Sequence, residues 1–547
     1  MAIQQPINGQ IGKNGVRQSE GALSPNIADT QQNHYLAPDR VIPVIFIPGI
    51  MGSNLRMTAE RQQQLSKKNN VAWNPDKLKE AGSLIFADAA ERQLTLDPSA
   101  TVVDLYDPKS NPTGDPKESA ASRHGNVKPG KTTHLSQEDA RQRGWGEVMF
   151  SSYGQMLNTC ESLLNRMFTN GKLQPGWKDI VDADPKAWQA ASSLPKLTEA
   201  DLKQASKGCW FPVHAFGYNW LQSNGDSAKL IAKRIHDLIS GYQKHSRCEK
   251  VIIVTHSMGG LVGRALAHPS YGNLQDKILG IVHGVMPATG APAAYRRMLA
   301  GFESGNMVEK AVLGSSGPDV MAVLGNAPGG LQLLPSVSYG TNWLHIISTH
   351  GQTLKQLPQS DPYEEIYSRS DVWWGMLREE WINPAGQDRA GAQFTRQHLK
   401  SAKHFHQALT GCYHPNSYAH YGCDAKRKAF QKVVWEVKSS KPIANPDSLQ
   451  ILHDSGKGNL QLQHPQAKPS GGMYPESIAA FIRDPSDPGD QTVPMRSADD
   501  QLNSGKFKGI FRQTGYEHQA SYKDKNALAS TLYSIVQIAR QMEWEGA

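Results

Sequence analysis

Several short apolar runs in this sequence are nearly continuous and rich in β-branched residues, which is typical of strands buried on both faces of a parallel sheet. The clearest run, within residues 41–54, ends abruptly at Pro-Gly and Gly-Ser, and a second run covers residues 250–255. Similar runs predict further strands at residues 279–285, 342–349 and 508–514.

Apolar positions spaced for one face of a helix occur in the segments that alternate with these runs. Residues 226–244 form one such segment, and either Asp226 or Ser227 can cap its start. Residues 526–542 form a last amphipathic helix. Strands alternating with helices predict an α/β fold in which a mostly parallel sheet has helices on both faces.

Two long tracts rich in Gly, Pro, Trp and Tyr interrupt this alternation. A connection of such length inside a compact domain is usually a cap, a lid or a subdomain. We therefore expect a polar, loosely ordered segment at 1–38, a core at 39–56, 213–291 and 486–547, a first insertion (a cap) at 57–212, and a second (a cap or lid) at 292–485.

Composition favours a soluble globular protein, since 38% of the 547 residues are hydrophobic and 20% are charged. The net charge of +8 is mild at this length, and no nucleic-acid motif accompanies it, so an anionic lipid surface is at least as plausible a partner. The N-terminus lacks the apolar core of a signal peptide, and no run approaches the ~18 apolar residues of a membrane span. We expect synthesis in the cytoplasm and any export without an ordinary signal peptide.

The stretch VIIVTHSMGGLVGRAL, residues 251–266, predicts a strand, a tight turn and a helix with Ser257 at the turn. This is the pattern of a nucleophile elbow, which lifts a serine hydroxyl above the strand ends. Gly259 and Gly260 supply the small residues on one side, whereas Thr255 stands where glycine is usual. Because short motifs match by chance, an ordinary βα turn explains this stretch equally well on its own.

Two downstream residues favour the catalytic interpretation. A serine nucleophile needs a base and an acid that orients it, and in this fold they follow in the order Ser, Asp, His. Asp490 lies in a turn rich in Gly and Pro, and His518 lies in the loop after the strand predicted at 508–514. Each alone could be an ordinary turn or loop residue, but their order predicts a triad of Ser257, Asp490 and His518.

The developing oxyanion needs two N–H donors. Met258 follows the serine, and the loop after the strand ending at Ile47 supplies Ile50, with Met51 as the alternative. This chemistry requires no metal and no cofactor. The acidic stretch RDPSDPGD, residues 483–490, could bind calcium structurally, although a Pro-rich turn explains it better.

Five cysteines, an odd number, argue against a disulfide scaffold. Cys412, His414, His420 and Cys423 offer zinc-ligand chemistry without the usual close Cys pairing. A metal site, a Cys412–Cys423 disulfide in an oxidising compartment, and a plain aromatic and polar loop all remain open, and the loop is favoured.

Four stretches together resemble the lecithin:cholesterol acyltransferase-like lipases of the α/β-hydrolase superfamily: VIPVIFIPGIMGSNL, HAFGYNWLQS, THSMGGLVGRAL and GDQTVP. Thr255 and Gln491 each replace a glycine of that family's pattern. More narrowly, the polar N-terminus and the stretch HGVMPATGAPAAYRRM make the chain similar to the antibacterial lipase effectors of bacterial type VI secretion.

The resemblance implies a serine lipase that hydrolyses ester bonds of membrane lipids, above all glycerophospholipids. It also implies a lid, delivery by the secretion apparatus into the periplasm of a target bacterium, and a cognate immunity protein. Two other functions stay open: a lipid acyltransferase, in which an alcohol replaces water, and a non-enzymatic binding or delivery protein with a relic hydrolase fold.

Two apolar segments of the second insertion are candidates for the lid. Residues 371–381 include Trp373 and Trp374, and tryptophan suits a membrane interface. Buried packing is the alternative for this segment, and a slightly better one. Residues 320–335 join an apolar helical pattern to a glycine hinge.

Overall fold

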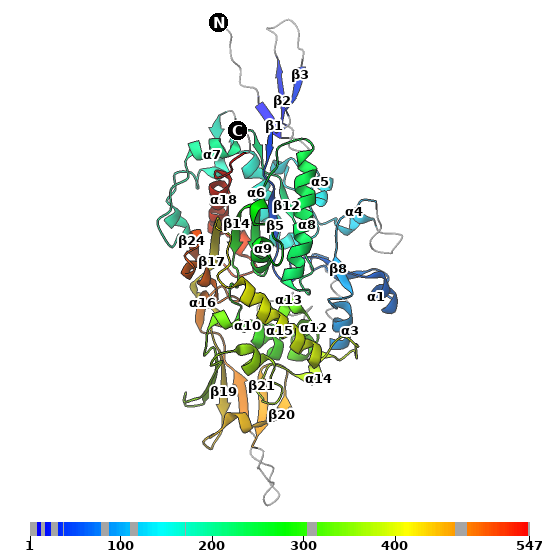
Figure 1. Cartoon of the computed structure of the whole chain (residues 1–547), viewed down its shortest axis with the longest axis vertical. Helices are drawn as coiled ribbons and strands as arrows, with labels where there is room; N and C mark the ends of the chain where they lie inside the picture. The colour runs from blue at the N-terminus through cyan, green and yellow to red at the C-terminus, as the bar shows by residue number, and fades with distance from the viewer. Residues whose placement is uncertain are drawn as a thin grey trace, which may run out of the picture.

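A computed structural model describes the chain at residues 38–77, 87–109, 119–169, 171–303, 314–464 and 478–544, and as strands at 8–11, 17–22 and 31–36. The molecule is elongated, with the parallel sheet in one half and a second sheet at the opposite end (Figure 1). None of the described helices is long and apolar enough to cross a membrane.

A six-stranded sheet, parallel throughout, forms the core and has the order β12-β5-β13-β14-β17-β24. Its strands are β5 (Val44–Ile47), β12 (Val213–Ala215), β13 (Val251–His256), β14 (Ile278–Gly284), β17 (Ser417–Gly422) and β24 (Phe507–Gln513). The strands predicted within 41–54 and at 250–255, 279–285 and 508–514 are therefore all present. This is the mostly parallel sheet that the sequence predicts.

The near-continuous apolar runs arise because both faces of this sheet are covered. Alternate residues of a strand point to opposite faces, so Ile253 joins one hydrophobic cluster, while Ile252 and Val254 join another. Helices α8 (Asn224–Gln243) and α9 (Gly259–Ala267) pack together on the first face. Helices α6 (Phe150–Asn165) and α18 (Lys525–Ala539) cover the second.

The start of α8 differs from the expected one. The helix begins at Asn224, and the Ser223 side chain accepts a hydrogen bond from the Gly225 N–H. Asp226 and Ser227, the predicted caps, lie inside the first turn. A serine before the first helical residue caps as well as an aspartate does, so composition alone did not identify the capping residue.

One strand of the core sheet, β17, was not predicted from the sequence. Strand β17 lies in the range expected to form the second insertion, 292–485, yet it pairs with β14 and β24 inside the parallel sheet. The expected boundaries of the core were therefore wrong at this point, because the core also includes residues 417–422. Strand β17 has the sequence SYAHYG, and all six residues are buried. Because it contains polar residues, its sequence does not have the apolar pattern by which a core strand is recognised.

The second insertion also contains a second six-stranded sheet, with the order β16-β15-β19-β22-β21-β20. The strand predicted at 342–349 is β15 of this sheet, not a strand of the core. The others are β16 (Thr353–Leu357), β19 (Val433–Lys438), β20 (Gln450–Asp454), β21 (Asn459–Gln463) and β22 (Ile478–Ile482), with β15 at Leu344–Ser348.

Helices of the same insertion lie between the two sheets (Figure 1). They are α10 (Pro292–Ala300), α12 (Gly317–Leu324), α13 (Pro328–Leu331), α14 (Glu379–Ile382) and α15 (Ala392–Leu409). Two short strands, β18 (Asp424–Ala429) and β23 (Asp487–Gly489), pair with each other. Helices α16 (Met495–Ala498) and α17 (Asp500–Asn503) follow β23 along the chain.

The first insertion consists of short elements. They are β6 (Leu55–Met57), α1 (Ala59–Gln64), β7 (Val71–Trp73), α3 (Ala89–Thr95), β8 (Thr101–Val103), α4 (Ala120–Arg123), α5 (Gln137–Gln142), β9 (Phe168–Thr169), β10 (Lys172–Leu173), α7 (Glu199–Ser206) and β11 (Cys209–Trp210), which pairs with β4 (Arg40–Val41). Helix α6, described above, lies in the same range.

The N-terminal segment contains three antiparallel strands, β1 (Asn8–Ile11), β2 (Arg17–Ala22) and β3 (Gln31–Leu36). These correct the expectation of a loosely ordered segment at 1–38 at those positions. The rest of the segment up to residue 37 lies outside the described residues.

Candidate active site

Ser257 stands at the turn between β13 and α9 with a left-handed backbone (φ 52°), a conformation that is costly for a residue other than glycine. The turn is so tight that only glycine fits beside it. A Cβ atom on Gly259 would lie 2.3 Å from the Pro48 carbonyl oxygen and 2.5 Å from that of Ile47. The chain thus has the geometry of a nucleophile elbow.

The residues predicted as a triad lie together in one hydrogen-bonded line. His518 Nε2 is 2.7 Å from Ser257 Oγ, and His518 Nδ1 is 2.9 Å from Asp490 Oδ2. A carboxylate only accepts hydrogen bonds, so Nδ1 carries the proton and Nε2 is left to accept from the serine hydroxyl. All three side chains are buried, and they come from the carboxyl ends of β13 and β24 and from the turn after β23.

The Asp490 carboxylate is held by its own turn. Its Oδ1 accepts hydrogen bonds from the N–H groups of Thr492 (3.1 Å) and Val493 (2.7 Å). The His518 N–H in turn donates to the Asp490 carbonyl oxygen at 2.9 Å. Gln491, which follows Asp490 in this turn, has a φ of 75°. This left-handed conformation explains why glycine is usual at this position in the family pattern. The turn keeps its shape here with glutamine.

The other replaced glycine is also accommodated. Thr255 is fully buried in β13, its carbonyl oxygen accepts a hydrogen bond from the Tyr522 hydroxyl at 2.8 Å, and its methyl group faces Gly263 of α9. The missing side chain at Gly263 leaves the room that a glycine at position 255 would otherwise supply. Neither departure from the family pattern disturbs the geometry of Ser257.

Sequence reasoning missed a second histidine that supports the site. His256 Nε2 donates to the His518 carbonyl oxygen at 3.0 Å, and the Tyr153 hydroxyl donates to His256 Nδ1 at 3.1 Å. The Gly49 N–H points to the same hydroxyl at 3.4 Å, so this network joins the loop after β5 to the loop that bears His518. Burial lowers the pKa of His256 to about 3, which keeps Nδ1 free to accept. A lone histidine beside a serine gave no sequence signal for this role.

The two predicted oxyanion donors both belong to loops next to Ser257. Met258 immediately precedes α9, so its N–H is at the positive end of that helix. Ile50 lines the same cavity as Ser257, and so does the alternative, Met51, whose φ is 63°. Within the described residues, none of these three N–H groups donates a hydrogen bond to the protein.

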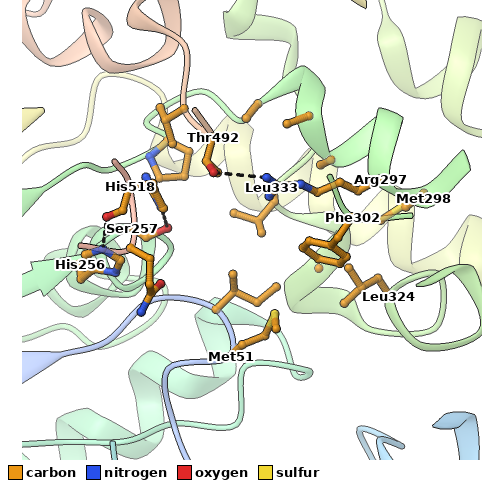
Figure 2. Close-up of a pocket in the computed structure, with 18 of the residues that line it drawn as sticks. Met51, His256, Ser257, Arg297, Met298, Phe302, Leu324, Leu333, Thr492 and His518 are labelled. Atoms are coloured by element: carbon orange, nitrogen blue, oxygen red, sulfur yellow. Dashed lines mark hydrogen bonds between the residues drawn. The ribbon is translucent and has the colours of Figure 1, made fainter. Parts of the chain in front are cut away.

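A cavity of about 850 Å³, including its open mouth, lies in front of Ser257 and His518 (Figure 2). Its wall is mainly apolar and comes from the loop after β5, from the segment that follows β14 and continues into the second insertion, and from the turn after β23. The apolar residues include Ile50, Met51, Ala291, Ala293, Ala294, Met298, Phe302, Leu324, Leu333 and Val493. Leu324 and Leu333 belong to the lid candidate at 320–335, whose role as a lid stays a prediction.

The tryptophans proposed for membrane docking are buried. Trp373 is 2% exposed and Trp374 is 1% exposed. Their indole N–H groups donate to the Pro446 carbonyl oxygen (2.7 Å) and to Asp447 Oδ1 (3.0 Å). The docking hypothesis is wrong for this conformation, because both rings fill the core beneath the second sheet. The alternative of buried packing, which the sequence left open, accounts for them.

Replacing Trp373 by Ala is therefore expected to lower the free energy of unfolding by about 3–5 kcal/mol, the usual cost of removing a buried tryptophan. Any loss of hydrolysis should be equal on lipid vesicles and on a soluble short-chain ester. Denaturant unfolding together with both assays checks this, and Trp373→Phe should recover part of the stability. Wild-type stability with a selective loss of vesicle binding would restore the docking hypothesis.

The cysteine and histidine cluster is dispersed by β17. Cys412 precedes the strand, Cys423 follows it, and both are free thiols. His414 bonds within its own turn, where the Asn416 N–H donates to its Nδ1 at 3.2 Å, while His420 is buried inside the sheet. In the described part of the chain, no group of three His, Cys, Asp or Glu residues is arranged to hold a metal ion.

Comparisons with known proteins show what the chain is related to. Residues 214–311 match the family model described as a PGAP1-like alpha/beta domain. The structure is similar to a chain in the crystal structure of the Tle4-Tli4 complex, with a TM-score of 0.76 and 30% sequence identity, covering 92% of this chain and 99% of that one. No curated protein matches the sequence.

The fold and the matched domain define an α/β-hydrolase, and the chain is a lipase. It belongs to the Tle4 family, and the resemblance to type VI secretion lipase effectors carried by the sequence motifs is confirmed.

Proposed function

We propose that this lipase effector hydrolyses ester bonds of glycerophospholipids through an acyl-enzyme on Ser257. The observation that carries the proposal is the hydrogen-bonded line of Ser257, His518 and Asp490 at the edge of a mainly apolar cavity. The apolar wall suits an acyl chain, and the line of side chains suits acyl transfer.

In the first half-reaction, His518 Nε2 takes the proton of Ser257 while Oγ attacks the ester carbonyl carbon. The N–H groups of Met258 and Ile50 stabilise the oxyanion, and Asp490 stabilises the imidazolium that forms. His518 then protonates the leaving alcohol, a lysophospholipid. In the second half, His518 deprotonates a water that attacks the acyl carbon, and the fatty acid leaves as Ser257 regains its proton.

The comparison with the Tle4-Tli4 complex also suggests a partner protein for this chain. The complex to which this chain is similar holds Tle4 with Tli4. We propose that a protein of the Tli4 kind is the immunity partner of this chain, and that it covers the cavity mouth formed by the second insertion. Delivery by secretion-apparatus components into the periplasm of a target bacterium completes the proposed route.

Mixed bacterial phospholipids incubated with the protein are expected to yield free fatty acid and lysophospholipid in equal amounts, measured by lipid mass spectrometry. Ser257→Ala protein is the matched control. Expression directed to the periplasm should be toxic, and cytoplasmic expression much less so. Toxicity of periplasmic Ser257→Ala protein, or equal harm from both compartments, would contradict a lipase effector and favour a non-enzymatic one.

A further inference from the structure

One arginine lies in the mainly apolar wall of the active-site cavity, whose polar lining residues also include Thr492, Glu517 and Gln519. Arg297, on α10, lines the cavity together with Ser257. Figure 2 shows its side chain reaching toward Thr492, with Phe302, Met298 and Leu324 on the same side of the cavity and Ser257 across from them. The triad chemistry proposed above does not use this guanidinium.

Arg297 has no carboxylate partner of its own among the described ion pairs. Glu303 is shared by two arginines, because its carboxylate lies 2.9 Å from Arg297 Nε and 3.9 Å from Arg296 Nη1. Burial opposes ionisation of Glu303, but the two arginines outweigh it and lower the pKa of this carboxyl. Arg297 therefore receives only part of the charge of Glu303, while the Asp484 carboxylate contributes to balancing Arg296.

Arg297 also has hydrogen bonds to spare. Its Nε donates to Glu303, and its Nη2 donates to Thr492 Oγ1 at 3.3 Å. A guanidinium carries five N–H donors, and among the described residues Nη1 has no acceptor. A partly buried cation without its full set of acceptors is costly, so a ligand that supplies negatively charged oxygen is favoured there.

A second donor without a partner faces the same cavity. Gln519 follows His518 directly and lines the cavity. Its amide nitrogen is buried and has no hydrogen-bond partner in the described protein. The cavity thus combines an apolar surface for a hydrocarbon chain with two donors that lack acceptors, as a lipid with a polar anionic group requires.

We propose that Arg297 binds the phosphodiester of the lipid substrate and selects glycerophospholipids over neutral glycerides. This inference rests on the lipase function proposed above. A phosphodiester lies only a few bonds from the ester carbonyls of a glycerophospholipid, and a guanidinium pairs with phosphate oxygens through two parallel N–H groups. A diacylglycerol offers the same esters but no anion at that position.

Arg296 supplies a matched control. It shares Glu303 with Arg297 but does not line the cavity, so Arg296→Gln removes the same charge from the same cluster without changing the cavity wall. The test compares Arg297→Gln, Arg297→Lys and Arg296→Gln. The substrates are phosphatidylglycerol, phosphatidylethanolamine and diacylglycerol in identical detergent micelles, and a soluble nitrophenyl butyrate.

For Arg297→Gln, kcat/KM on both phospholipids should fall about 10- to 100-fold, the range for a lost charge-assisted contact. Its activity on diacylglycerol and on nitrophenyl butyrate should stay within about 3-fold of wild type, because those substrates do not use the cation. Arg297→Lys should recover part of the phospholipid activity, since it keeps the charge but not the fork. Arg296→Gln should leave the ratio of phospholipid to diacylglycerol activity unchanged.

An equal loss on all four substrates, or the same change of ratio in Arg296→Gln, would overturn the role of Arg297. Wild-type protein that hydrolyses the esters, combined with an unchanged ratio in Arg297→Gln, would refute this inference while leaving the lipase intact. Wild-type protein that hydrolyses none of the substrates would instead refute the proposed function. Should Arg297→Gln fail to fold, the ratio measured with Arg297→Lys decides.

Discussion

Replacing Ser257 by Ala is expected to lower kcat by about 10⁴- to 10⁶-fold, the largest single effect in this chain. The hydroxyl is the only group hydrogen-bonded to His518 Nε2 among the described residues, so its removal deletes the nucleophile and leaves the base without its proton donor. His518→Ala should cost about as much. Asp490→Asn should cost about 10⁴-fold, because an amide no longer fixes the proton on Nδ1. Initial rates on a soluble ester measure each loss.

The three losses should not add. Ser257 and His518 act as a unit, so the double variant Ser257→Ala/His518→Ala should be no slower than Ser257→Ala alone. All variants should unfold at denaturant concentrations close to wild type, which separates lost chemistry from lost structure. Additive losses, or near-wild-type turnover by Ser257→Ala protein, would be inconsistent with a triad.

The protein should lose stability steeply in mild acid, because burial keeps several histidines of the described residues neutral. Burial lowers the pKa of His256, His283 and His420 to about 3, that of His406 to about 4, and that of His214 well below its usual range. In the unfolded chain each histidine takes up its proton near pH 6.5.

The sign of this effect follows from proton binding. Below about pH 6.5 the unfolded chain holds more protons than the folded one, so the free energy of unfolding falls as the pH falls toward the folded pKa values. Each such histidine contributes about 1.4 kcal/mol per pH unit within that window. Glu147 and Glu161 oppose the trend, because burial raises their pKa values. They are fewer, so the histidines prevail.

Urea unfolding between pH 8 and pH 4.5 tests this prediction, with stability expected to be nearly flat above pH 7 and to decline below pH 6. His420 offers the cleanest control, because both its ring nitrogens are buried without a partner in the described protein. His420→Leu should make the acid slope shallower by about one proton. Unchanged stability down to pH 4.5 in the wild type would contradict neutral burial of these groups.

The elements that could be predicted from the sequence are those with a clear local pattern of residues. Strands β5, β13 and β14 are apolar enough to be recognised as buried on both faces, and the turn at Ser257 is marked by glycines that steric contact requires. Asp490 and His518 were recognisable as candidates because this fold places such residues in the order Ser, Asp, His along the chain. These features depend on local pattern, which one sequence carries.

Other features depend on contacts between distant segments. Strand β17 is buried although it contains Ser417 and His420, and only its neighbours in the sheet reveal why. The apolar run at 342–349 predicts a strand, but its sequence does not indicate which of the two sheets the strand joins. Likewise, Trp373 and Trp374 look the same in sequence whether they face a membrane or a core, and only the residues packed on them decide.

The most direct test of the central claim is covalent capture of the nucleophile. A nitrophenyl alkylphosphonate ester, which phosphonylates an activated serine with loss of nitrophenol, should add one phosphonyl group per chain, and peptide mass spectrometry should locate it on Ser257. Labelling should abolish ester hydrolysis in proportion to occupancy, and it should be absent in Ser257→Ala protein and much slower in His518→Ala protein. Hydrolysis that persists in fully labelled protein, or a label on another residue that accounts for the inhibition, would contradict an acyl-enzyme on Ser257.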